Sequence, residues 1–144
     1  MKRQTKNYTC GVASVANAAE YLGVPGINQG KLRKLMYADE DDGTDEEEMK
    51  RGILALNLAF DEVQSDQPSD AIGWLSQHLY WYGPAIVCLD DESHWVLVIG
   101  TSSNRVVVFD PALGAGVKVY TRAGFLTRWR SSTPPRYYAL GVSL

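Results

Sequence analysis

The sequence predicts an α+β domain, with a helical half first and a mostly antiparallel sheet second. Up to about residue 82, apolar residues recur every three or four positions, which is typical of helices packed on a core. From Pro84 onward, short runs of valine, isoleucine and aromatic residues are separated by turn residues, which is typical of strands. Helices followed by strands favour an α+β arrangement. The 144 residues contain no linker or internal repeat and indicate one domain over residues 1–144.

The first helix is expected over Cys10–Leu22. Its apolar residues have helical spacing, and Gly23 followed by Pro25 ends it. Because this apolar face is rich in alanine, we expect a central helix that packs closely against its neighbours. The apolar residues are Val12, Val15, Ala16, Ala19 and Leu22.

Two shorter helices are expected next. The second covers Lys31–Tyr37, and its inward residues are Leu32, Leu35 and Met36. Thr44 and Glu47 have the spacing of a capping box, which predicts that Thr44 is the N-cap of the third helix. The apolar residues of that helix are Met49, Ile53 and Leu56.

A short strand at Phe60–Val63 is followed by a fourth helix that opens at Pro68 and ends at Gly83-Pro84. That helix carries Ile72, Leu75, Leu79 and Tyr82. The remaining strands are expected at Pro84–Leu89, His94–Gly100, Val106–Asp110, Val117–Tyr120 and Tyr137–Val142, with a small helix at Ala123–Trp129.

Composition excludes several classes of function. The net charge is −3, and no basic stripe alternates with aromatic residues, so neither nucleic acid nor an anionic membrane is an expected partner. No apolar run reaches the ~18–20 residues that span a bilayer. The basic N-terminus leads into polar residues and does not resemble a secretory signal. With only two cysteines, a cytoplasmic protein with free thiols is expected, acting on a peptide, protein or small molecule.

Cys10 is the first candidate for chemistry, because it stands where the first helix begins. The helix dipole and the free N–H groups at that end favour a thiolate, and a neighbouring imidazolium favours it further. A cysteine nucleophile needs a base within reach and a third group that orients the base. His94 opens one predicted strand and Asp110 closes the next, so this pair is the candidate base and orienting group.

The register of this predicted hairpin decides whether the two side chains meet. A turn centred on Ser102 makes His94 and Asp110 direct cross-strand partners on one face of the sheet. A turn centred half a residue later puts them on opposite faces unless a β-bulge corrects the register. Both alternatives are open from the sequence.

Gln4 completes the candidate site. Acyl transfer builds negative charge on the carbonyl oxygen, and a side-chain amide together with the backbone N–H of the nucleophile can bind that charge, at about 3 kcal/mol for each donor. A glutamine shortly before Cys10 can fold back over the helix start to do this.

The other candidate residues fit structural roles better. Cys88 lies in an apolar strand and is expected in the core, and His78 is expected to be structural or at the surface. A zinc site would have to bring both cysteines and both histidines together without any ligand-spacing motif. The sequence therefore predicts no metal and no cofactor.

With these residues placed, the sequence resembles the bacteriocin-processing, double-glycine leader peptidases, which are papain-like cysteine peptidases. The resemblance covers nearly the whole chain. It rests on five segments, Gln4–Ala13, Asp42–Thr44, Gly83–Val87, His94–Val98 and Asp110–Gly114.

The resemblance implies a papain-like fold, with Cys10 on a helical half and His94 and Asp110 on a sheet half. It implies Cys10 as nucleophile, His94 as general base and then acid, Asp110 as the orienting group and Gln4 as an oxyanion donor. In that family the peptidase usually precedes a membrane transporter, a possible partner here, and cleaves after Gly-Gly in a leader peptide. Two departures are that the chain stops at Leu144, without transporter parts, and that Thr9 stands where the family usually has Asp.

Other functions for the same site stay open. A thioester intermediate also serves an amidase or an acyltransferase that acts on a non-peptide or isopeptide substrate. A papain-like domain can also bind a peptide without cutting it. Because the chain keeps Gln4, Cys10, His94 and Asp110, the sequence favours a working cysteine peptidase.

Overall fold

The structure is a computed structural model that describes residues 1–6, 9–39, 43–112 and 116–144. The elements of the first half are α1 (Cys10–Tyr21), α2 (Gln29–Met36), α3 (Glu46–Ala55), β1 (Ala59–Ser65) and α4 (Pro68–Trp81). Those of the second half are β2 (Ala85–Leu89), β3 (His94–Thr101), β4 (Arg105–Asp110), β5 (Gly116–Thr121), α5 (Arg122–Trp129) and β6 (Tyr137–Ser143). The predicted α+β fold class is confirmed.

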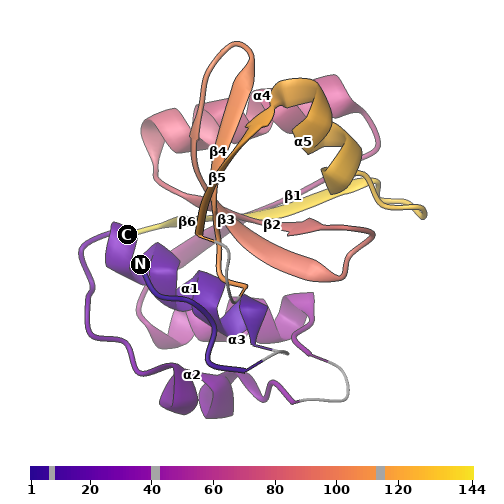
Figure 1. The fold of residues 1–144 in the computed structure, drawn as a ribbon. Coiled ribbons are helices and arrows are strands. Elements are labelled where there is room, and N and C mark those ends of the chain that lie inside the picture. Colours follow the sequence, from indigo (N-terminus) through magenta and orange to yellow (C-terminus); the bar gives the residue numbers. More distant parts are fainter. Residues whose placement is uncertain (7–8, 40–42, 113–115) are drawn as a thin grey trace.

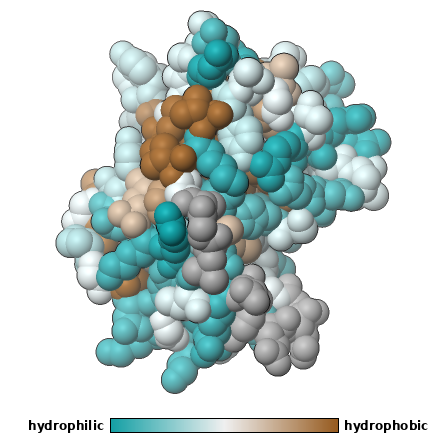
Figure 2. Space-filling view, in the orientation of Figure 1, coloured by the Kyte–Doolittle hydropathy of each residue, from teal (hydrophilic) through white to brown (hydrophobic). Residues whose placement is uncertain are grey.

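The strands form one six-stranded antiparallel sheet in the order β1-β6-β2-β3-β4-β5. Helices α1, α2 and α3 lie on one side of this sheet, and α4 and α5 lie on the other (Figure 1). Each side buries its own apolar core against the sheet. Val117 and Val119 of the outer strand β5 are exposed. Figure 2 shows a hydrophobic area in the region where Figure 1 places β4 and β5. None of the helices in the described ranges is long and apolar enough to cross a membrane.

Helix α1 is buried along nearly its whole length, as its alanine-rich face predicts. Gly11 allows the start of the helix to approach β3 closely. A Cβ added there would lie 2.8 Å from Met49 Sδ and 3.1 Å from Trp95 Cδ1, which is too close without movement. One turn on, the Ser14 hydroxyl donates to the Trp95 carbonyl at 3.3 Å. These contacts fix Cys10 beside the first residues of β3.

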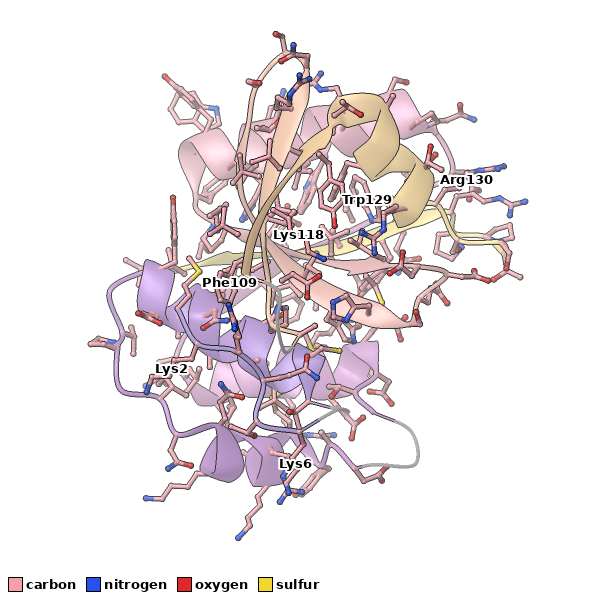
Figure 3. The ribbon with its side chains drawn as sticks, viewed as in Figure 1. Lys2, Lys6, Phe109, Lys118, Trp129 and Arg130 are labelled. Atoms are coloured by element: carbon pink, nitrogen blue, oxygen red, sulfur yellow. The ribbon has the colours of Figure 1, made fainter. Side chains whose placement is uncertain are left out.

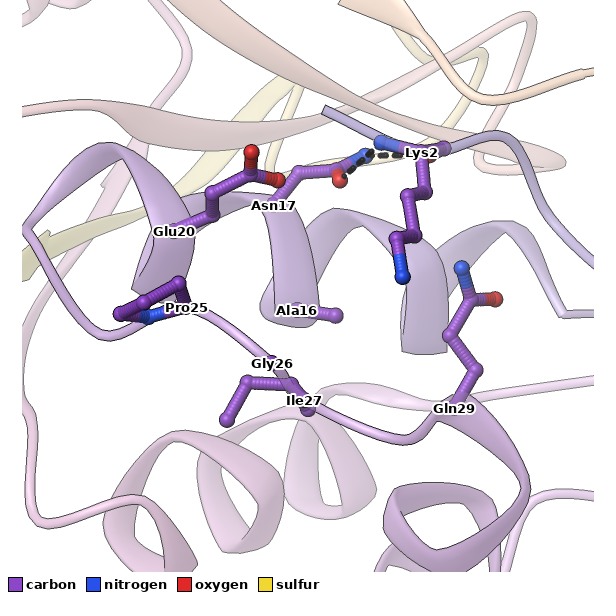
Figure 4. Close-up of a pocket in the computed structure, with 8 residues that line it drawn as sticks. All are labelled: Lys2, Ala16, Asn17, Glu20, Pro25, Gly26, Ile27 and Gln29. Atoms are coloured by element: carbon purple, nitrogen blue, oxygen red, sulfur yellow. Dashed lines mark hydrogen bonds between the residues drawn. The ribbon is translucent and has the colours of Figure 1, made fainter.

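The N-terminal segment is held against α1. The Asn17 side chain accepts a hydrogen bond from the Lys2 backbone N–H at 2.8 Å and donates one to the Lys2 carbonyl at 2.8 Å (Figure 4). Further along, the Gln4 backbone N–H donates to the Pro111 carbonyl at 2.8 Å. The segment therefore runs from α1 to the end of β4. A cavity of about 220 Å³ lies between it and the chain leading into α2, and Figure 4 shows its lining.

The third helix begins one residue later than predicted. Asp45, not Thr44, is the N-cap, and its side chain accepts from the Glu48 N–H at 2.8 Å. Glu48 Oε1 in turn accepts from the Asp45 N–H at 3.1 Å, so the capping box has the expected form but not the expected residues. The Thr44 carbonyl instead accepts the indole N–H of Trp95 at 2.9 Å. That contact with β3 keeps Thr44 outside the helix.

Two residues predicted on apolar helix faces are exposed. Helix α2 buries a narrow stripe that contains Leu32 and Met36, and Leu35 lies beside that stripe with 53% of its surface exposed. Tyr82 is 65% exposed, because α4 ends at Trp81 and the helical spacing stops there.

The β3–β4 hairpin contains a β-bulge. Near the turn, Gly100 pairs with Val107, but beyond Ile99 the register shifts and Val98 pairs with Val108. His94 and Asp110 are therefore not direct cross-strand partners, which excludes the first of the two registers that the sequence left open. Extending the shifted register makes them diagonal neighbours on the same face of the sheet, as the bulge alternative requires.

Candidate active site

Cys10 is half-buried and is the first residue of α1. The N-cap residue Thr9 gives no side-chain hydrogen bond to the helix, because its hydroxyl bonds to the backbone of Lys6 instead. The first turn of α1 contains no acidic residue. The positive end of the helix dipole therefore acts on the Cys10 sulfur without a neighbouring first-turn carboxylate.

His94 and Asp110 form a hydrogen-bonded pair. His94 Nε2 lies 2.7 Å from Asp110 Oδ1, and the Asp110 side chain is only 3% exposed. The same Oδ1 accepts the Ala112 backbone N–H at 3.0 Å, and Lys118 Nζ donates to Oδ2 at 3.2 Å. The carboxylate is thus held on both oxygens, which fixes the orientation of the imidazole that it binds.

The side chains of Cys10 and His94 are in contact. A hydrogen bond with Cys10 is the largest cause that raises the pKa of His94 to about 8, and burial opposes it while Asp110 adds to it. Because Nε2 is bonded to Asp110, Nδ1 is the ring nitrogen left for Cys10. The three side chains therefore lie in the order Cys10, His94, Asp110.

Asp110 is ionised in this arrangement. Burial alone would raise the pKa of its carboxyl, but the Ala112 N–H, the His94 ring and its charge, and Lys118 together lower it. An ionised Asp110 favours the protonated imidazole, which is the state that forms when a base takes a proton from a thiol.

Gln4 is buried near this site, with 7% of its surface exposed. Its bond to Pro111 places it beside the end of β4, directly after Asp110. The side-chain amide donates to the Lys6 carbonyl at 2.7 Å. Its predicted role as an oxyanion donor stays a prediction. Of the five resembling segments, residues 7–8, 42 and 113–114 lie outside the described residues.

Cys88 and His78, for which the sequence favours structural roles, are both buried. Cys88 is buried in β2, and burial raises the pKa of its thiol far above the ordinary range. His78 is 4% exposed, stacks on Trp74 at 5.3 Å, and has Nε2 3.2 Å from the Val142 carbonyl oxygen. His78 is therefore a structural residue of α4. Within the described ranges, no group of three or more His, Cys, Asp or Glu residues is arranged to hold a metal ion.

Lys118, which binds Asp110 from β5, was not predicted as a residue of the site. Alternation along that strand puts Lys118 and Val117 on opposite faces, but nothing in the pattern indicates which carboxylate a lysine meets. The hydrogen bond from the Ala112 backbone N–H to Asp110 was not predicted either, because every residue except proline has a backbone N–H and the sequence does not mark which one binds a side chain.

A cavity of about 230 Å³ lies next to the start of α1. Its lining includes Trp95 and Thr44, the residues that pack against Gly11, together with carboxylates of Glu46 and Glu92. A second hollow of about 380 Å³ shares Glu46, Glu92 and Tyr138 with it. The space next to the start of α1 is therefore lined by polar and acidic residues as well as by an indole ring.

The site combines a thiol at a helix N-terminus, an imidazole on the sheet and a buried carboxylate behind the imidazole ring. This combination defines the class of papain-like cysteine peptidase domains. The chain belongs to the Peptidase C39 family, whose model matches residues 1–133. This confirms the family that the sequence resembles.

Solved structures show the same fold. The peptidase domain of Streptococcus ComA, a bifunctional ABC transporter of a quorum-sensing pathway, has a TM-score of 0.78 at 19% identity, over 99% of this chain and 96% of that one. A double-glycine-motif protease from an AMS/PCAT transporter, solved with its leader peptide, has a TM-score of 0.76 at 17% identity, over 98% and 88%. A C39-like peptidase from Bacillus anthracis has a TM-score of 0.76 at 13% identity, over 100% and 93%. No curated protein matches the sequence.

Proposed function

We propose that this protein is a cysteine peptidase that hydrolyses a peptide bond through Cys10, His94 and Asp110. The observation that carries the proposal is the arrangement of these three side chains. Cys10 from the helical half interacts with His94, and His94 is hydrogen-bonded to Asp110 on the sheet. Membership of the Peptidase C39 family supports the same chemistry.

In the first half of the reaction, His94 Nδ1 takes the thiol proton and the Cys10 sulfur attacks the carbonyl carbon of the substrate. The tetrahedral intermediate carries its charge on the carbonyl oxygen, where the Cys10 backbone N–H and the Gln4 amide are the proposed donors. The C–N bond then breaks, the imidazolium gives its proton to the leaving amine, and a thioester with Cys10 remains.

In the second half, His94 takes a proton from water, and the resulting hydroxide attacks the thioester carbonyl. The C–S bond breaks, the sulfur recovers the proton from His94, and the new carboxylic acid leaves. Asp110 keeps the ring in one tautomer and stabilises its charged form in both halves. The reaction needs only peptide and water.

The proposed substrate is a precursor peptide in which Gly-Gly precedes the cleaved bond. Support comes from the family and from the double-glycine-motif protease, a relative in fold that binds a leader peptide. The cavity next to the start of α1, lined by Thr44 and Trp95, is the proposed space for substrate residues near the cleaved bond.

The test uses synthetic peptides that carry Gly-Gly before the bond to be cut, with matched peptides that carry Ala-Ala. Mass spectrometry of the products identifies the cut. We expect the wild type to cleave after Gly-Gly, and Cys10→Ala and His94→Ala to leave the peptides intact while circular dichroism shows a folded chain. Cleavage by Cys10→Ala at the wild-type rate would refute the mechanism. Binding of the peptide without cleavage by the wild type would indicate a peptide-binding domain instead.

A further inference from the structure

The turn that leads into His94 has an unusual backbone. Asp90, Asp91 and Glu92 have φ angles of 56°, 57° and 65°, so three consecutive residues other than glycine adopt the left-handed region. Side chains with a Cβ adopt this region only at a cost in free energy, and then usually as single residues. Such a turn persists only where surrounding contacts hold it.

The end of α5 supplies those contacts to Asp90. Arg128 donates from Nε to Asp90 Oδ1 at 2.9 Å and from Nη2 to Asp90 Oδ2 at 2.5 Å, a two-point pair in which the guanidinium matches the carboxylate. The Asp90 backbone N–H donates back to the Arg128 carbonyl at 2.9 Å. Both the side chain and the backbone of Asp90 are therefore bound to one residue.

The next residue of the turn is held from the same direction. Ser132 donates to Asp91 Oδ1 from its backbone N–H at 2.7 Å and from its hydroxyl at 2.9 Å. These bonds to neutral donors lower the pKa of the Asp91 carboxyl. Within the turn, the Ser93 hydroxyl donates to the Asp90 carbonyl at 2.6 Å. The residue after Ser93 is His94.

Arg128 also reaches the strand that carries the second partner of Asp110. Its Nη1 donates to the Tyr120 hydroxyl at 2.5 Å, and the guanidinium lies over the Tyr120 ring at 5.3 Å. Tyr120 and Lys118 are two residues apart on β5, so their side chains share a face of the sheet. One guanidinium thus links the turn before His94 to the strand whose lysine binds Asp110.

We infer that Arg128 is a positioning residue, which holds the left-handed turn at Asp90–Glu92 and thereby aims the His94 ring at Cys10. This inference rests on the proposed function, because it assumes that the Cys10–His94 pair is the reactive centre. Arg128 does not touch the reacting atoms. Its effect is on where the ring lies, and displacements of about 1 Å in such a ring can cost up to about 100-fold in rate.

Arg130 provides a matched control. It is two residues away from Arg128 along the chain and exposed at the surface, after the buried Trp129. Figure 3 shows Trp129 and Arg130 at the end of α5. Arg130→Ala removes the same charge from the same segment without touching the turn. Arg128→Lys keeps the charge but loses the two-point geometry. Asp90→Asn keeps the shape of the other partner and removes its charge.

The experiment measures the rate at which iodoacetamide alkylates Cys10, with the buried Cys88 as internal reference and mass spectrometry to assign the site. We compare the wild type with Arg128→Ala, Arg128→Lys, Arg130→Ala and His94→Ala, and thermal unfolding shows that each variant is folded. We expect Arg128→Ala to slow alkylation of Cys10 by about tenfold, toward the His94→Ala rate. Arg128→Lys should lie between, and Arg130→Ala should match the wild type.

The outcomes separate the inference from the proposed function. If Arg128→Ala reacts like the wild type while His94→Ala is slow, the positioning role is overturned and the Cys10–His94 pair stands. If Cys10 reacts no faster in the wild type than in His94→Ala, both proposals fail. If Arg128→Ala does not fold, Asp90→Asn takes its place, and a wild-type alkylation rate in that folded variant overturns the positioning role.

Discussion

The stability of the folded chain should fall between about pH 6.5 and pH 8 because of His94. Its pKa is raised from 6.5 to about 8, which means that the folded state binds the proton more tightly than the unfolded state does. Each unit of such a difference corresponds to about 1.4 kcal/mol, so the protonated ring adds about 2 kcal/mol to the free energy of unfolding. The full contribution is present below pH 6.5 and is lost as the pH rises through about 8.

The assay is urea denaturation of the wild type and of His94→Gln at several pH values between 6 and 9. Because other titrating groups are common to both chains, the difference between the two unfolding free energies isolates His94. We expect this difference to shrink by about 2 kcal/mol across the range. In a Cys10→Ala background the change should be smaller, because Cys10 is the largest cause of the raised pKa of His94.

A difference that stays constant from pH 6 to pH 9 would refute the reasoning. It would mean that the pKa of His94 is the same in the folded and unfolded states, and that the contacts with Cys10 and Asp110 do not favour the charged ring. A difference that grows with pH would mean that burial, which lowers the pKa of His94, outweighs those contacts.

Two further substitutions test the site and its surroundings. Gly11→Ala should destabilise the fold by about 1–3 kcal/mol, because the new methyl group meets Met49 and Trp95. Gly73→Ala in α4, where nothing lies within 4 Å of the new Cβ, should stabilise it by about 1 kcal/mol, and chemical denaturation of both chains checks the contrast. Asp110→Asn should keep measurable peptide cleavage, in contrast to Cys10→Ala, because the amide oxygen still accepts the imidazole N–H. It should also lower the alkaline limit of activity in a pH–rate profile, because Asp110 no longer raises the pKa of that imidazole; an unchanged limit would contradict this role.

The fold was predictable because its signals are local. The helical spacing along α1 and the apolar runs of β2 and β3 each lie within a dozen residues, and they are the segments that bury most completely. The N-cap of α3 was predicted wrongly, because a contact with a residue far away in the sequence decides which of two neighbouring residues is the cap. Thr44 and Asp45 are both good N-caps, and the bond from Trp95 to the Thr44 carbonyl decides between them.

The residue types of the candidate site could be chosen from the sequence, whereas its geometry could be predicted only in part. The chain has only two cysteines and two histidines, and Asp110 closes the strand that was predicted to follow the one opened by His94, so Cys10, His94 and Asp110 could be chosen from the sequence. The bulge at Ile99, which brings His94 and Asp110 to one face, is flanked by Gly100, but a single glycine in a strand does not specify how the register shifts. Arg128 was not predicted either, because its partner Asp90 lies 38 positions away along the chain.

The way in which Asn17 holds the N-terminal segment constrains how the sequence can vary. Both of its hydrogen bonds go to the backbone of residue 2, so the identity of the side chain at Lys2 is irrelevant to them. Only an amide offers a donor and an acceptor at that reach, and aspartate lacks the donor. In a saturation library, position 2 should therefore accept most residues, except proline, which lacks the N–H, whereas position 17 should retain asparagine. A polar residue in the middle of a buried helix should thus be retained because it binds the backbone of residue 2, where the side chain itself can vary.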